Sequence, residues 1–453
     1  MYRKDSIIIE EWLKSSGKAL LVTGARQIGN CLLYTSPSPR DEIAKSGYSK
    51  FEVNFIDLPD LVGYLNAKMS AEEFLVKLKM IMPEDCKPQE TVVFLDEIQK
   101  CPEIVTKIKF LVEEGSFKYV MSGSLLGVEL KGIASVPVGY LTVLRMYPMD
   151  FEEFILANNV SQITMEMLKE KFETCQPVDE FIHQKLLSLF FIYLIVGGMP
   201  DAVKTYIATK DIREVDKVQR DIVMLYKEDF SQYESEDKKL KLISIYDIIP
   251  AELNKQNKKF VFTMLDKELK FDRYENSFLW LKDAGVALPV YNVETPTIPL
   301  KASKSSNVFR LFSNDTGLLT SAYPAETKIE LINKNGEVNN GAHFENAVVQ
   351  QLTANSLEPY FCKKKNIGEL DVLVEMGGKV VPIEVKSGKA YKTHKALDHF
   401  MEISDYHIEK AYVLSVANVE QEGAVVYLPI YMCYLLKERK LGRLIVNLDM
   451  EGL

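Results

Sequence analysis

The chain is poor in the residues that build disulfide scaffolds and zinc sites, and it lacks a long uninterrupted apolar segment. Its six cysteines include no Cys-x-x-Cys pair, and its five histidines are not spaced as metal ligands, which argues against both kinds of scaffold. The longest apolar run, Leu186–Met199, contains Ser188 and ends in two glycines before its last residue, so it predicts a buried helix instead of a membrane span. We find no secretory signal, and the thiol pattern predicts a cytoplasmic protein.

The bulk composition is that of a globular protein with an acidic balance. The chain has 453 residues, of which 47% are hydrophobic and 26% are charged. This length suggests about two to four domains. The formal net charge is −9 and the pI is near 5.4, so nonspecific coating of nucleic acid is not expected, although a local basic groove remains open.

Residues 1–150 alternate short β-rich runs with helical patterns, which predicts a parallel α/β sheet. The predicted strands are rich in Val, Leu, Phe or Tyr and comprise Ala19–Thr23, Phe51–Phe55, Thr91–Leu95, Tyr119–Met121 and Tyr140–Leu144. A helical pattern over Ala71–Met82 lies between the second and the third strand. We therefore expect one α/β domain over residues 1–150.

The turn after the first predicted strand follows the phosphate-binding pattern G-x-x-x-x-G-K-[ST] at its first six positions. Those positions are Gly24, Ala25, Arg26, Gln27, Ile28 and Gly29. Asn30 and Cys31 then stand where the pattern has lysine and a hydroxyl residue, which reach the β- and γ-phosphates and the Mg²⁺ ion. We expect residues 24–30 to cradle the phosphates of ATP through backbone N–H groups, with an affinity reduced by the missing charge.

Residues 30–41 do not suit the helix expected after such a loop. Pro37 and Pro39 each remove a backbone donor and clash with the preceding turn. The stretch from Cys31 to Asp41 resembles a translated sequencing adapter, and Asn30 is what a lysine codon becomes when the adapter supplies its third base. We interpret residues 30–41 as an assembly artefact and exclude them from the fold. The alternative is a naturally degenerate loop in a pseudo-ATPase.

Two carboxylates follow a strongly apolar predicted strand. Val92–Leu95 is fully apolar and is followed at once by Asp96 and Glu97. This is the Walker B pattern, in which Asp96 holds the Mg²⁺ shell and Glu97 acts as general base on the attacking water. The next predicted strand ends in small polar residues, and we expect Ser122 and Ser124 to contact the γ-phosphate or that water.

The rest of the chain divides into three further predicted regions. Residues 151–235 repeat apolar residues at three- and four-residue spacing and predict a helical region. Residues 236–308 contain three helical patterns and a strand pattern, an order typical of a winged helix-turn-helix. Residues 309–453 alternate helices and strands, with a hairpin turn at Gly377-Gly378, and predict a C-terminal α/β domain.

Four charged residues of this last region form a candidate nuclease-like site. Glu384 and Lys386 are two residues apart on a predicted strand and therefore share one face. Asp371 lies on the preceding predicted strand, and Glu345 lies on a helix upstream. We expect Asp371 and Glu384 to ligate Mg²⁺ or Mn²⁺, Glu345 to complete the pocket, and Lys386 to position the nucleophile.

Several motifs in one order resemble the bacterial and archaeal AAA-type ATP-binding proteins that carry a C-terminal domain of unknown function. The motifs are Gly24–Gly29, Leu95–Gln99 followed by Pro102, Ser122–Ser124, Pro148–Phe154, Gly197–Val203 and Phe312–Leu319. The resemblance implies an AAA-like P-loop core, a helical and winged-helix middle, and an α/β end similar to PD-(D/E)xK restriction endonucleases. It also implies ATP and Mg²⁺ as cofactors.

These motifs together predict an ATPase coupled to a DNA-facing nuclease-like domain, with nucleotide binding impaired in the sequence as it stands. Two alternatives stay open: a metal-dependent nuclease that uses the ATPase as a switch, and a non-catalytic regulator that binds DNA. The expected partners are ATP and DNA. No membrane is expected as a partner, and assembly into an oligomer is left open.

Overall fold

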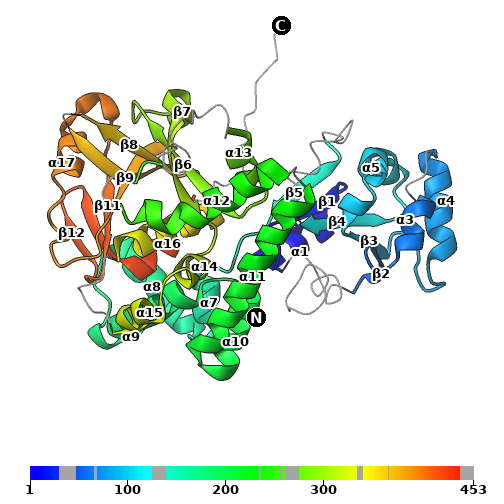
Figure 1. Cartoon of the computed structure of the whole chain (residues 1–453), viewed down its shortest axis with the longest axis horizontal. Helices are drawn as coiled ribbons and strands as arrows, with labels where there is room; N and C mark the ends of the chain where they lie inside the picture. Colours follow the sequence, from blue (N-terminus) through cyan, green and yellow to red (C-terminus); the bar gives the residue numbers. More distant parts are fainter. Residues whose placement is uncertain are drawn as a thin grey trace, which may run out of the picture.

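Two β-sheets organise the chain, and the long helix α11 (Ile212–Tyr233) runs between them (Figure 1). The computed structural model describes residues 1–29, 47–65, 69–124, 139–233, 236–255, 258–260, 275–333, 340–365 and 367–438. A parallel-sheet core, a helical middle and a C-terminal mixed sheet follow one another along this part of the chain. The predicted α/β fold class is therefore confirmed.

The first sheet contains five parallel strands in the order β2-β3-β4-β1-β5. Its strands are β1 (Ala19–Gly24), β2 (Ser49–Asn54), β3 (Thr91–Asp96), β4 (Lys118–Ser124) and β5 (Leu141–Arg145). The helices around it are α1 (Asp5–Ser15), α3 (Pro59–Leu65), α4 (Ala71–Ile81) and α5 (Glu103–Glu114). Because the strands are parallel, the turn after β1 and the acids after β3 lie at one edge, separated by the width of β4.

Side-chain alternation gives this sheet two apolar faces, as expected for a parallel sheet covered on both sides. Leu21 and Met121 pack in the cluster that includes α3, α4 and α5, whereas Leu20 and Val120 pack in the cluster that includes α1. All four side chains are buried. Burial on both faces is the reason that these strands are continuous apolar runs in the sequence.

Helices fill the middle of the chain. They are α7 (Phe151–Ala157), α8 (Gln162–Thr174), α9 (Glu180–Val196), α10 (Pro200–Thr209), α11 and α12 (Glu236–Leu253). α7 begins with a capping box, in which Asp150 and Glu153 each accept a hydrogen bond from the other's backbone N–H. The apolar run of the sequence lies mostly in the buried part of α9. Among the described residues, no helix combines the length and the apolar character needed to cross a membrane.

The second sheet contains eight strands of mixed direction in the order β12-β13-β11-β10-β9-β8-β6-β7. Its strands are β6 (Ala287–Val293), β7 (Lys304–Ser313), β8 (Tyr360–Lys364), β9 (Gly368–Met376), β10 (Lys379–Val385), β11 (Ala411–Ser415), β12 (Glu420–Glu422) and β13 (Val425–Pro429). The helices in this half are α13 (Glu275–Asp283), α14 (Thr316–Ser321), α15 (Ala325–Ile332), α16 (Gly341–Ala354) and α17 (Lys395–Glu402).

The hairpin of β6 and β7 belongs to the second sheet, because β6 also pairs in parallel with β8. The boundary expected between residues 308 and 309 therefore falls inside β7. The strand expected to complete a winged helix extends the C-terminal sheet instead. The helix expected between α12 and α13 falls mostly on residues 261–274, which lie outside the described residues.

Two glycines allow the helical middle and the segment before α16 to meet at very short range. A Cβ on Gly198 would lie 1.9 Å from the carbonyl oxygen of Met149, and a Cβ on Gly317 would lie 2.5 Å from that of Val196. The Gly198 N–H donates a 2.6 Å hydrogen bond to the buried Asp315 carboxylate. Two motifs of the sequence, around Gly198 and around Asp315, thus pack against each other.

Candidate functional site

The turn that follows β1 curls tightly back on itself. A Cβ on Gly24 would lie 2.2 Å from Cδ1 of Ile28 and 2.7 Å from the carbonyl oxygen of Met146. Gln27 and Gly29 adopt positive φ angles of 66° and 98°. Nη1 of Arg3 donates a 3.1 Å hydrogen bond to the Ile28 carbonyl. We call residues 24–29 the phosphate loop, because a bend of this kind points backbone N–H groups toward one side.

Asp96 is the last residue of β3 and is almost fully buried at the same sheet edge. Ser122 on β4 donates a 2.5 Å hydrogen bond to Oδ1 of Asp96. Asn54 at the end of β2 donates one of 3.2 Å to Oδ2. The carboxylate is therefore fixed by residues from the two neighbouring strands. Ser122 was predicted to belong to the site; Asn54 was not, although its place at a strand end was a usable signal.

Burial raises the pKa of Asp96 to about 7; the hydrogen bond from Ser122 opposes the increase, and the adjacent Glu97 adds to it. Glu97 has a positive φ of 55°, which a non-glycine residue rarely adopts, and its side chain accepts a 2.5 Å hydrogen bond from Gln99. Strained backbone at the end of a buried strand is common at functional sites. Both acids are therefore buried, and the side chain of each is held in place by hydrogen bonds.

Helix α11 of the helical middle and the turn after α13 contact the phosphate loop. Nη1 of Arg26 lies 2.6 Å from Oδ1 of Asp229. A Cβ on Gly285 would lie 3.2 Å from the backbone nitrogen of Ala25, and Arg145 donates a 2.6 Å hydrogen bond to the Lys282 carbonyl. Nothing in the sequence marked Asp229, because it lies in an ordinary amphipathic helix 203 residues from Arg26.

Two predicted members of this site are outside what the structure describes. Asn30 and the rest of residues 30–41 lie outside the described residues. Ser124 ends β4, but its side chain is not described. The described part of the site therefore consists of the phosphate loop, Asp96, Glu97 and Ser122.

The four predicted charged residues of the C-terminal half come together in one cavity. Its volume is 370 Å³, and its lining includes Glu345 from α16, Asp371 from β9, and Glu384 and Lys386 at the end of β10. Lys258, which the sequence had placed in a winged helix, also lines it. We call this cavity the C-terminal pocket. β9 and β10 are antiparallel neighbours, so Asp371 and Glu384 approach each other across the hairpin.

Cations already neutralise much of the acidic charge in the C-terminal pocket. Glu345 forms an ion pair with Lys258, and Nη1 of the buried Arg310 lies 3.7 Å from its Oε2. Nζ of Lys386 lies 2.7 Å from Oε1 of Glu384. Burial raises the pKa of Glu384 to about 7, the nearby Asp371 adds to the increase, and Lys386 opposes it.

The carboxylates of the C-terminal pocket do not form a ready metal site. Oδ2 of Asp371 accepts a 3.0 Å hydrogen bond from the backbone N–H of Val385. Oε2 of Glu384 is buried and accepts no hydrogen bond from the described residues. Across the described ranges, no group of three or more His, Cys, Asp or Glu residues is arranged so that it could hold a metal ion. Metal ligation by Asp371 and Glu384, with Glu345 completing the pocket, therefore stays a prediction.

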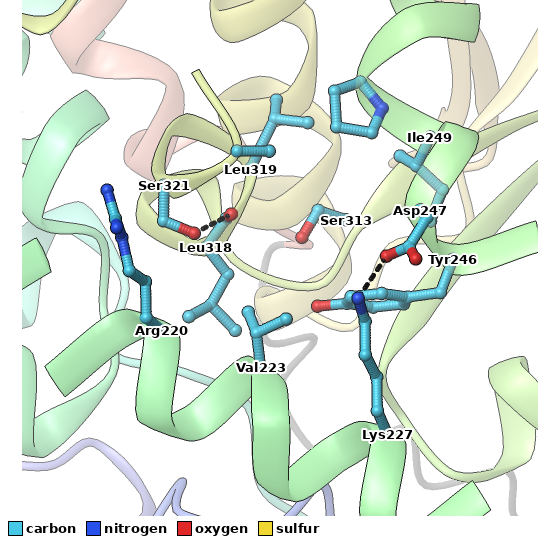
Figure 2. Close-up of a pocket in the computed structure, with 12 residues that line it drawn as sticks. Arg220, Val223, Lys227, Tyr246, Asp247, Ile249, Ser313, Leu318, Leu319 and Ser321 are labelled. Atoms are coloured by element: carbon cyan, nitrogen blue, oxygen red, sulfur yellow. Dashed lines mark hydrogen bonds and ion pairs between the residues drawn. The ribbon is translucent and has the colours of Figure 1, made fainter. Parts of the chain in front are cut away.

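A second cavity lies beside α11, on the face next to the one that contacts the phosphate loop. Its volume is 210 Å³, and Figure 2 shows Val223 and Lys227 of α11 opposite Tyr246 and Asp247 of α12. Nζ of Lys227 and Oδ1 of Asp247 are 2.6 Å apart, so this ion pair joins the two helices at the cavity. Ser313 and Leu318 line the cavity from the segment around α14.

Family models match three separate parts of the chain. Residues 16–155 match an AAA domain, residues 187–329 match a domain of unknown function (DUF8612), and residues 340–432 match another domain of unknown function (DUF4143). The first range contains the phosphate loop, Asp96, Glu97 and Ser122. The third contains Glu345, Asp371, Glu384 and Lys386. No curated protein matches the chain.

Solved structures similar to this chain include archaeal ATPases and replication proteins. The Walker-type ATPase PABY2304 of Pyrococcus abyssi is 14% identical over 71% of this chain and 95% of that chain, with a TM-score of 0.42. The ORC2 protein of Aeropyrum pernix is 14% identical over 73% and 92%, with a TM-score of 0.28. The Cdc6p protein of Pyrobaculum aerophilum is 11% identical over 73% and 92%, with a TM-score of 0.25.

TM-scores of this size do not establish a shared fold, so the assignment rests on the strand order and on the AAA-domain match. The strand β4 lies between the loop-bearing β1 and the acid-bearing β3, and the acids lie at the carboxyl edge with the loop. Residues 16–155 therefore match an AAA domain and form a parallel-sheet α/β core with the strand arrangement of an AAA-type ATPase-like fold.

Proposed function

We propose that the chain is a cytoplasmic ATPase whose nucleotide state controls a DNA-binding C-terminal half. One observation carries the proposal: Asp96 and Glu97 leave β3 at the sheet edge that also carries the phosphate loop, one strand away. Ligands of open parallel sheets bind outside the carboxyl ends of the strands. The free thiols among the described cysteines suit a reducing compartment.

The residues present fit ATP and Mg²⁺. Asp96 is a buried carboxylate whose raised pKa reflects the cost of ionisation without a cation nearby. A bound Mg²⁺ would supply the positive charge that makes the ionised form favourable. In this proposal Ser122 and Asn54 keep the carboxylate oriented, and Glu97, held by Gln99, accepts a proton from the attacking water.

The phosphate loop supplies backbone donors but lacks the usual charge after Gly29. Asn30 offers no ammonium group and Cys31 offers no hydroxyl. One ammonium near a phosphate oxygen contributes roughly 4 kcal/mol at an effective dielectric of 20, before desolvation is subtracted. We therefore propose that the sequence as it stands binds ATP weakly, and that a lysine at position 30 restores the affinity.

For the C-terminal half, DNA binding without cleavage is supported better than nuclease activity. Lys258, Arg310 and Lys386 each lie within ion-pair distance of a carboxylate of the pocket. Ion pairs of this kind leave fewer negative charges to hold a divalent cation, whereas lysines at the pocket wall can contact phosphate. The fold proposed for this half is the PD-(D/E)xK type, with α16, β8, β9, β10, α17 and β11 in that order along the chain.

The nuclease alternative keeps one supporting observation. Glu345, Asp371 and Glu384 line a single cavity, and Oε2 of Glu384 is buried without a hydrogen bond from the described residues. A modest movement of Lys258 would expose a third carboxylate to an ion. Incubation of plasmid DNA with Mn²⁺ tests this alternative: cleavage that Asp371→Ala abolishes would establish it.

The ATPase proposal is tested by turnover and binding in one series. Protein with Asn30→Lys, Cys31→Thr and a helix-forming sequence in place of the remaining adapter-like residues should bind and hydrolyse ATP, and DNA should change the rate. Glu97→Gln in this protein should keep ATP binding and lose turnover. Absence of ATP binding in the repaired protein would reject the proposed function.

A further inference from the structure

One face of α11 contacts the phosphate loop at Arg26. Nη1 of Arg26 lies 2.6 Å from Oδ1 of Asp229. One turn earlier, the hydroxyl of Tyr226 donates a 3.2 Å hydrogen bond to the carbonyl oxygen of Arg26. Residues three positions apart lie on the same face of a helix. α11 therefore contacts both the side chain and the main chain of Arg26, the one charged residue of Gly24–Gly29.

Asp229 places a buried carboxylate next to a loop that is proposed to bind phosphate. Its side chain is 4% exposed, and its Oδ2 is buried and accepts no hydrogen bond from any described residue. Burial raises the pKa of Asp229 to about 6; Arg26 opposes the increase, while Glu97 and then Glu228 add to it. The interaction with Glu97 places Asp229 in the electrostatic neighbourhood of the proposed catalytic acid.

A triphosphate in the phosphate loop changes the balance of charge around Arg26. Its oxygens attract the guanidinium, which pairs with phosphate as readily as with carboxylate. We propose that Asp229 is a positioning residue of the nucleotide site. Without nucleotide, Asp229 holds Arg26 against α11; when ATP occupies the loop, Arg26 leaves Asp229 and pairs with the phosphates. This inference rests on the proposed nucleotide site and adds its link to the C-terminal half.

α11, which contacts Arg26, is also bonded to several other elements. Tyr226 also accepts a 3.4 Å hydrogen bond from Nδ2 of Asn314, next to the buried Asp315. Two turns earlier, Gln219 donates hydrogen bonds of 2.8 and 2.9 Å to the carbonyl oxygens of Ile195 and Val196. The adjacent face of α11 lines the cavity in Figure 2, where Lys227 pairs with Asp247 of α12. α11 thus joins the phosphate loop to the helical middle and to the segment before α16.

Titration of Mg²⁺·ATP into the full chain tests the inference. We expect Asp229→Asn to bind ATP about tenfold more tightly than the parent, a size typical of coupling between two groups. Asp229→Glu keeps the charge and should remain close to the parent. The matched control is Asp221→Asn, an exposed position on the same helix, which should change nothing.

The double variant separates a positioning role from a general structural one. In an Arg26→Ala background, Asp229→Asn should have no further effect on ATP affinity, because the two side chains act as a pair. Backbone amide exchange gives a second readout that does not need nucleotide. Exchange over residues 222–233 should be faster in Asp229→Asn than in the parent, and ATP should speed it in the parent.

The outcomes distinguish failure of the inference from failure of the proposed function. Equal ATP affinity of the parent and Asp229→Asn, or a gain that persists without Arg26, overturns the inference and leaves the nucleotide site in place. If neither protein binds ATP even after the loop is restored with Asn30→Lys and Cys31→Thr, the proposed function fails. Amide exchange then still tests the contact between Asp229 and Arg26. If exchange over residues 222–233 is the same in the parent and in Asp229→Asn, the inference is overturned.

Discussion

Ser122 on β4 and Asp96 on β3 are joined by a 2.5 Å hydrogen bond between the ends of two neighbouring parallel strands. The bond holds a buried carboxylate in one orientation, and the two side chains that donate hydrogen bonds to it, Ser122 and Asn54, are both uncharged. A carboxylate in that position is costly to ionise, and a divalent cation removes the cost. This relationship leads directly to a measurable pH dependence.

Replacement of Asp96 by Asn should stabilise the protein at about pH 8. The folded-state pKa of Asp96 is about 7, above the ordinary 3.8, so the folded protein binds this proton more tightly than the unfolded chain does. The free energy of unfolding therefore falls as the pH rises from about 4 to about 7. Asn carries no such penalty, and Asp96→Asn should raise the melting temperature by roughly 5 °C at pH 8.

Thermal unfolding followed at several pH values checks this prediction. The difference between Asp96→Asn and the parent should shrink as the pH falls and vanish below about pH 3, where the parent carboxyl is mostly protonated in both states. Because other buried acids titrate equally in the two proteins, their contributions cancel in the comparison. A melting temperature of Asp96→Asn that is lower than that of the parent at pH 8 would contradict the assignment of the raised pKa.

Restoration of the loop motif should increase nucleotide affinity. The variant carries Asn30→Lys and Cys31→Thr, with helix-forming residues in place of the adapter-like segment. We expect ATP to bind at least about tenfold more tightly, because a lysine charge near phosphate is worth more than that even after desolvation. Isothermal titration of both proteins measures the difference. Micromolar binding by the sequence as it stands would show that the missing lysine is dispensable.

Replacement of Glu97 by Gln should remove turnover without removing binding. In the loop-restored protein, loss of the general base should lower the turnover number by about 100-fold or more, while the ATP dissociation constant stays within a few-fold. Glu72→Gln, at an exposed position on α4, is the control and should have the parent rate. An unchanged rate in Glu97→Gln would place the base elsewhere.

The sequence predicted the strand ends well and the contacts between distant segments poorly. Asp96 and Glu97 were found because buried parallel strands are continuous apolar runs, and residues just after such a run must lie at the sheet edge. Glu384 and Lys386 followed from the two-residue period of a strand. Asp229 and Lys258 left no such signal, because their roles depend on tertiary packing of α11 and of the segment after α12.

The sequence did not reveal, for a related reason, that the boundary expected at residue 308 falls inside β7. A helical region followed by a strand is compatible with a winged helix, and also with an edge hairpin added to a larger sheet. The pairing of β6 with β8, through Tyr291 with Tyr360 and Asn292 with Phe361, separates the two, and it joins residues far apart in the sequence. Local patterns carry no information about such a partner.

Replacement of Gly198 by Ala should strongly destabilise the protein. The added Cβ would lie 1.9 Å from the Met149 carbonyl oxygen, and backbone cannot move aside as a flexible side chain can. We expect a loss of about 3 kcal/mol or more in the free energy of unfolding, as for other overpacked positions. Gly63→Ala is the control, because nothing lies within 4 Å of its added Cβ and the site is in a helix. Urea denaturation compares them, and equal midpoints would disprove the close packing.

Replacement of Lys386 by Gln should weaken DNA binding in a salt-dependent way. If Lys386 contacts a phosphate, its loss should reduce the slope of log affinity against log salt concentration by about 1 and lower the affinity for all sequences alike. Lys379→Gln lies at the other end of β10 and should leave the slope unchanged. Because Lys386 also neutralises Glu384, the variant should lose more affinity above about pH 7, where Glu384 is ionised, than below it. A slope equal to that of the parent would remove the C-terminal pocket from the DNA interface.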